Sequence, residues 1–169
     1  MKTSQPFLMM PGETRGAGPL NILGDQVWIK LAGVDCAGGL SIMEDVTPPQ
    51  AGPPLHRHSR EDEWFYVLEG DYLFEVDGNQ MTVGPGHSLF APRGTAHTFQ
   101  NIGPRPGRMI VLGQPAGMDV FFTELAAATK DMLEPDLSVI VPIFEKYGLE
   151  LLGPPLAARG QAGATASPI

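Results

Sequence analysis

Two stretches decide the fold, HRHSREDEWFYVLEG (residues 56–70) and GHSLFAPRGTAHTFQN (residues 86–101). Each consists of short apolar runs that end at Gly, Pro, Asn or Asp, which is typical of strands joined by tight turns. The same pattern extends outward over residues 21–113 and predicts eight short strands: 26–32, 40–46, 63–69, 72–76, 80–83, 88–91, 97–101 and 108–112. Eight short strands at this spacing indicate an all-β sandwich or closed barrel.

The chain changes character on both sides of this region. Residues 1–19 are rich in Gly and Pro without a period, and we expect an N-terminal arm. The barrel is expected over 20–115 and a helical extension over 116–153, with helices at 119–130 and 136–147. Pro142 lies inside the second of these, so a kink or restart is expected there. Residues 154–169 are expected to form a flexible tail.

Length and charge exclude several classes of protein. The 169 residues suit one domain, and 19 acidic against 11 basic side chains give a net charge of −8. We therefore expect no nucleic-acid partner and no membrane partner, since both require a basic face or a long apolar span. The single cysteine, Cys36, allows no intrachain disulfide, and a cytoplasmic location is expected.

Only four histidines are present, and two of them form the run His56-Arg57-His58. Residues i and i+2 of a strand share a face, so both imidazoles can reach one point while Arg57 points away. A polar turn over 59–62 would bring Glu63 back beside them, and His97 opens a later strand. Three imidazoles and a carboxylate, without a thiolate, suit one divalent transition metal: Fe, Ni, Mn, Cu or Zn.

The same residues also have less specific interpretations. A histidine pair in a Pro-rich loop is by itself more often a surface feature, and only the pattern with Glu63 and His97 favours a metal. Glu61 and Asp62 are rival carboxylates, but neither is expected to open the strand, and both are assigned to a solvated turn. His87 is likewise assigned to a turn.

These residues also carry a resemblance to a known family. The spacing of His56, His58, Glu63 and Gly70 resembles the first motif of the cupin superfamily. The second motif is matched by Gly86, Pro92, Gly94, His97 and Asn101, and residues 71–85 fit the loop between the motifs in single-domain cupins. The chain departs from the first motif at Gln50, where the family usually has glycine, and from the second at His87, where Asp is frequent.

The resemblance implies an antiparallel jelly-roll β-barrel with a metal held by His56, His58, Glu63 and His97. The three-His, one-Glu set and the stretch 117–155 are similar to quercetinase-like bacterial cupins. A metal-dependent dioxygenase acting on an aromatic or enol small molecule is thereby implied, with Glu63 also a catalytic base. Strand parity with Glu63 or His97 predicts that Phe65, Val67 and Phe99 line the substrate cavity.

Two other functions stay open, because one fold hosts many chemistries. Cupins with this ligand set include isomerases and lyases of hydroxy-carbonyl compounds, for which a polar cavity would be needed. A non-catalytic barrel that binds a small molecule is the third possibility. Residues 64–68 are apolar on both strand faces, and this predicts a homodimer in which one barrel covers the other.

Overall fold

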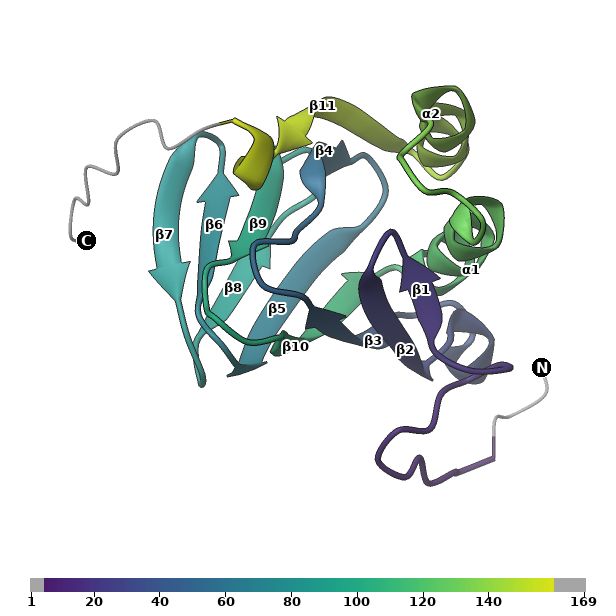
Figure 1. Cartoon of the computed structure of the whole chain (residues 1–169). Helices are drawn as coiled ribbons and strands as arrows, with labels where there is room; N and C mark the ends of the chain where they lie inside the picture. The colour runs from purple at the N-terminus through teal and green to yellow at the C-terminus, as the bar shows by residue number, and fades with distance from the viewer. Residues whose placement is uncertain (1–4, 160–169) are drawn as a thin grey trace.

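The computed structural model describes residues 5–159 and shows two β-sheets that face each other as a jelly-roll barrel (Figure 1). Every strand pairing in it is antiparallel. The six-stranded sheet has the order β1 (Leu20–Ile22), β2 (Asp25–Leu31), β3 (Ser41–Thr47), β10 (Gly107–Gln114), β5 (Asp62–Glu69) and β8 (Ser88–Ala91). The five-stranded sheet has the order β11 (Leu149–Pro155), β4 (Pro54–His58), β9 (His97–Asn101), β6 (Tyr72–Val76) and β7 (Asn79–Val83).

All eight strands predicted from the sequence are confirmed, each to within two residues at either end. Three further strands were not among those eight: β1, β4 and β11. The strand β11 lies in the stretch expected to be helical and pairs with β4 from His58 to Pro54. It therefore closes the edge of the sheet beside the two histidines.

Two helices and two short 3-10 turns complete the described chain. The helices α1 (Met118–Thr129) and α2 (Leu137–Lys146) confirm the predicted segments, and the turns cover Gly33–Cys36 and Leu156–Ala158. The carboxylate of Asp136 accepts a hydrogen bond from the Ser138 backbone N–H at 2.9 Å, which caps α2. A kink or a restart was expected at Pro142; the restart does not occur, since α2 continues through this residue.

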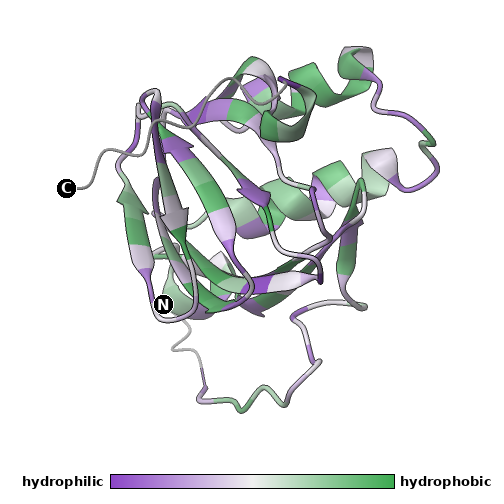
Figure 2. Ribbon diagram, turned by 60° about the vertical axis from the view of Figure 1, so that its left-hand side comes forward, coloured by the Kyte–Doolittle hydropathy of each residue, from purple (hydrophilic) through white to green (hydrophobic). Residues whose placement is uncertain are grey.

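The helices lie side by side at one side of the barrel, where α1 contacts β1 and α2 contacts β11 (Figure 1). Most of both helices is green in Figure 2, the colour of hydrophobic residues. Together with the first residue of β11, the buried ones form a second core cluster beside the barrel core: Phe121, Leu125, Ile140, Ile143, Phe144 and Leu149. The extension is thus a wall of the barrel rather than a separate unit.

The ends of the chain are only partly described. Residues 1–4 of the expected arm and residues 160–169 of the expected tail lie outside the described residues. Pro154 and Pro155 end β11, and a 3-10 turn follows, so the part of that tail before residue 160 has regular structure. Within residues 5–159, no helix is both long enough and apolar enough to span a membrane.

Candidate metal centre

Three strands bring the predicted ligands together. His56 and His58 lie on β4, two residues apart and therefore on the same face. His97 opens β9 and is the direct neighbour of His56 across the two strands. Glu63 is the second residue of β5 in the opposite sheet. All four side chains are buried, with at most 8% of any residue exposed.

The four side chains converge on one point inside the barrel. One nitrogen from each histidine and one oxygen of Glu63 all lie within 4.8 Å of one another. The Oε2 atom of Glu63 is 2.5 Å from Nε2 of His97 and 3.3 Å from Nε2 of His58. The cluster expected from the sequence therefore has a geometry that could hold a metal ion.

The hydrogen bonds of the histidine rings are of the kind expected for metal ligands. Nδ1 of His56 lies 2.8 Å from the carbonyl oxygen of Pro54, and Nδ1 of His97 lies 3.0 Å from that of Thr95. A carbonyl oxygen can only accept, so each Nδ1 donates its proton and Nε2 keeps its lone pair for the centre. Both nitrogens of His58 are buried without a hydrogen-bond partner, as expected of a ring placed for another ligand.

Electrostatics at the site favours a cation. Burial acts to raise the pKa of Glu63, but the charges of His58 and His97 outweigh it and lower that pKa to about 2. Burial and the neighbouring rings of His97 and His58 lower the pKa of His56 to about 3. For His97, burial acts to lower the pKa, but the Glu63 carboxylate outweighs it and raises that pKa. The Glu63 carboxylate thus stabilises a positive charge on His97, and it can stabilise a metal cation at the same place instead.

The assignment of Glu61 and Asp62 to a solvated turn was wrong in part, because Glu61 lies in the turn but is buried, and Asp62 belongs to a strand. Asp62 is the first residue of β5, and its carboxylate pairs with Arg93 at 2.8 Å. Glu61 is 5% exposed, and its Oε2 lies 3.4 Å from Nδ1 of His58. No sequence pattern distinguished Glu61 from a surface residue, because its carboxylate lies against Gly117, which immediately precedes α1 and is distant in the chain. His87 is exposed at its turn, as expected.

A cavity of about 900 Å³ opens from the metal ligands along the inside of the barrel. Phe65 and Phe99 line it, in agreement with their strand parity. Val67 does not line it, contrary to the expectation, and lies instead in the packed barrel core with Met43, Tyr72 and Met109. Much of the wall comes from the extension: Phe121, Phe122, Leu125, Ile140, Val141, Phe144, Leu149 and Leu151.

The cavity also contains two acidic residues that the sequence did not reveal. Asp25 on β2 and Asp45 on β3 both line it. Burial, with the neighbouring Asp45, raises the pKa of Asp25 to about 8. Burial also raises the pKa of Asp45 to about 6, against a 2.6 Å hydrogen bond from the Thr47 hydroxyl. The cavity therefore has a polar region apart from the metal ligands.

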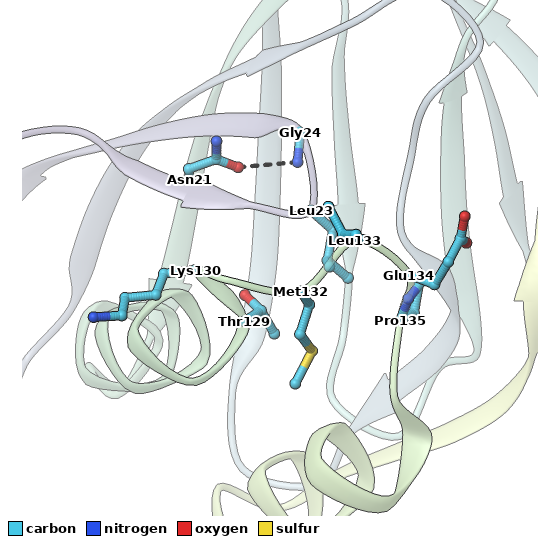
Figure 3. Close-up of a pocket in the computed structure, with 9 residues that line it drawn as sticks. All are labelled: Asn21, Leu23, Gly24, Thr129, Lys130, Met132, Leu133, Glu134 and Pro135. Carbon is cyan, nitrogen blue, oxygen red and sulfur yellow. Dashed lines mark hydrogen bonds between the residues drawn. The ribbon is translucent and has the colours of Figure 1, made fainter.

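A smaller hollow of about 390 Å³ adjoins this cavity, between the β1–β2 turn and the connection from α1 to α2 (Figure 3). In the turn, the side-chain oxygen of Asn21 accepts a hydrogen bond from the Gly24 N–H at 3.0 Å. Leu23 and Pro135 line both spaces, so these two segments form part of the cavity rim. Leu23 is 46% exposed and so adds an apolar side chain to this rim.

Comparison with known proteins agrees with the fold. Residues 43–113 match the cupin domain family. A germin-like protein of Oryza sativa subsp. japonica is 31% identical over 146 residues, which cover 80% of this chain and 67% of that protein. This chain is a cupin. The cupin match spans both β4 and β9, and so contains all four proposed ligands.

Other similar proteins have different described functions, or none. An uncharacterised protein of Methanocaldococcus jannaschii is 31% identical over 75 residues, 44% of this cupin and 60% of that protein. Quercetin 2,3-dioxygenase of Bacillus subtilis is 26% identical over 121 residues, 71% of this cupin and 34% of the dioxygenase. The matches thus span less than two thirds of both relatives. An RmlC-like cupin structure from Shewanella frigidimarina shares the fold, with a TM-score of 0.58, 22% identity and coverage of 70% of this chain and 98% of that chain.

Proposed function

We propose that this cupin is a mononuclear metal-dependent dioxygenase, quercetinase-like, that acts on an aromatic or enol small molecule. The observation that carries the proposal is the position of the four ligands, buried at the wall of a largely apolar cavity of about 900 Å³. The similarity to a quercetin 2,3-dioxygenase supports the same chemistry, although it covers only 34% of that enzyme.

His56, His58, Glu63 and His97 would hold one divalent transition metal: Fe, Ni, Mn, Cu or Zn. When bound, the metal would supply Lewis-acid activation of a substrate oxygen. The chain supplies the proton acceptor. The charges of His58 and His97 keep Glu63 ionised despite its burial, and its Oε2 faces the centre, so it can take the hydroxyl proton of a substrate bound there.

The aromatic walls determine what kind of substrate fits. Phe65 and Phe99 line the barrel side of the cavity, and Phe144 of α2 lies on the other side, its ring centroid 6.3 Å from that of His56. Flat apolar rings can hold a planar aromatic or enol molecule and keep water from the reacting carbon. Substrate would therefore bind with its acidic hydroxyl toward Glu63 and its apolar body between the rings.

Oxygen uptake tests the proposal directly. The purified protein is analysed for metal, loaded with each candidate metal in turn, and mixed with a flavonol or another enol in an oxygen-electrode cell. We expect oxygen consumption and a product that gains both oxygen atoms, with Glu63→Gln losing most of the rate. Arg57→Gln is the matched control, because Arg57 lies between two ligands but points outward to Glu150 at 2.6 Å. A metal-loaded protein that consumes no oxygen with any of these substrates would contradict the proposal.

A second candidate is a metal-dependent isomerase or lyase of a small hydroxy-carbonyl compound. Asp25 and Asp45 favour it, because carboxyl groups in the cavity can accept or donate hydrogen bonds to substrate hydroxyls. Turnover of hydroxy-carbonyl compounds without oxygen consumption would favour this candidate. Tight binding of a small molecule without any turnover would instead indicate a binding protein.

A further inference from the structure

Glu61 lies in the short turn between β4 and β5, directly behind a proposed metal ligand. Its Oε2 atom is buried without a hydrogen-bond partner among the described residues, and so is Nδ1 of His58. The two atoms face each other at 3.4 Å. Two buried polar atoms that lack other partners and lie this close need only a small movement to form a hydrogen bond.

This contact differs from those of the other two histidines. His56 and His97 direct Nδ1 to backbone carbonyl oxygens, whereas His58 directs it to a carboxylate. A carboxylate is the stronger acceptor, and a ring that donates Nδ1–H to it keeps Nε2 as a more basic lone pair. Nε2 of His58 is the nitrogen that lies 3.3 Å from Glu63 Oε2, on the side of the proposed metal.

The surrounding chain holds Glu61 in place. The backbone N–H and hydroxyl of Ser59 both donate to the carbonyl oxygen of Gly148, at 2.8 and 2.7 Å, which ties the turn to the start of β11. On the other side lies Gly117, immediately before α1. A Cβ atom at Gly117 would stand only 2.9 Å from Glu61 Oε1, so the missing side chain leaves the space that the carboxylate fills.

We propose that Glu61 is a positioning residue for the metal centre. Its carboxylate accepts the Nδ1–H of His58, fixes that ring with Nε2 toward the metal, and adds a second negative charge to that of Glu63. Two buried carboxylates balance the charge of one divalent cation. This inference rests on the proposed function only in requiring that His56, His58, Glu63 and His97 bind a divalent metal.

Metal titration of matched variants tests it. Metal-free wild type, Glu61→Gln, Glu61→Ala and Asp62→Asn are titrated with cobalt(II) chloride, and affinity and the visible spectrum of the bound ion are recorded. We expect Glu61→Gln to lose roughly 10-fold and Glu61→Ala up to about 100-fold in affinity, with an altered cobalt spectrum. Asp62→Asn removes the neighbouring carboxylate that pairs with Arg93, and its affinity should equal that of wild type.

The melting temperature of the metal-free proteins separates positioning from packing. Without metal, Glu61→Gln removes a buried charge that lacks a full partner, so its melting temperature should be unchanged or higher. Affinity and metal-free stability should therefore not fall together. Cobalt binding by Glu61→Gln as tight as that of wild type would overturn the inference, and so would parallel losses of affinity and metal-free stability. If wild type itself binds no cobalt, the proposed metal site fails as well.

Discussion

Gly52 lies so close to β9 that no other residue fits there. A Cβ atom at this position would overlap the backbone carbonyl oxygen of Phe99, which cannot move without disturbing the strand that begins with His97. We expect Gly52→Ala to destabilise the fold by about 1–3 kcal/mol, as other overpacked sites do. Thermal unfolding measures the effect. Gly153→Ala is the control, since the nearest atom to its Cβ would be 3.8 Å away; equal melting of the two variants would contradict the prediction.

Asp25 predicts a pH dependence of stability. Its folded pKa of about 8 is well above the value of about 3.9 for an unfolded chain, and Asp45 is shifted in the same direction. Between these values the folded state holds protons that the unfolded state has released. The free energy of unfolding should therefore fall as pH rises from about 4 to about 8.

Replacement of Asp25 by Asn isolates this contribution. Asn has the same size and no charge, so Asp25→Asn should be more stable than wild type at pH 8, by several kcal/mol, and should equal it near pH 4. Melting temperatures measured from pH 4 to 8 check this difference. Asp131→Asn, with a side chain 88% exposed, should follow the wild-type curve. A constant gap between wild type and Asp25→Asn at all pH values would refute the assignment.

At the scale of elements, α2 is expected to support the cavity chiefly through Phe144. This side chain is 7% exposed and packs edge-on against Phe121, with 5.0 Å between ring centroids. Phe144→Ala should cost about 3 kcal/mol of stability, because the surrounding helices cannot fill the space. Urea unfolding measures this cost, and metal content should stay unchanged, since no ligand is removed. Val120→Ala on α1, where Val120 is 53% exposed, should cost far less.

The sequence predicted those elements whose signals are local. Strand period and turn residues sufficed for eight strands, and i, i+2 parity placed His56 and His58 on one face. The strand β11 was missed, because its extended form depends on pairing with β4 rather than on its own residues, two of which are prolines. Glu61 was missed for the same reason: its burial depends on Gly117, which is distant in the chain.

At the scale of the whole molecule, the outer face of the six-stranded sheet carries an apolar row that crosses five strands. Strand register aligns its members side by side: Leu31, Ile42, Leu112, Trp64 and Phe90. Phe90 is 59% exposed and the other four are half-buried. Four charged side chains of the same sheet pair with one another, Glu44 with Lys30 and Arg108 at 3.1 and 2.9 Å and Arg108 with Glu69 at 3.5 Å. The charges of these four side chains sum to zero, although the whole chain has a net charge of −8.

The homodimer expected from the sequence stays a prediction, and this face is where we expect it to form. Two copies related by a two-fold axis could bury the apolar rows against each other, because charges paired within each copy leave little like-charge repulsion between them. Light scattering at micromolar concentration should then give a mass of twice 18.1 kDa. Phe90→Asp places a charge in the row and should give the monomer mass, whereas Leu133→Asp, at a fully exposed position in the connection from α1 to α2, should leave the dimer intact. Wild type of monomer mass, or a dimer that tolerates Phe90→Asp, would show that the apolar row has another role.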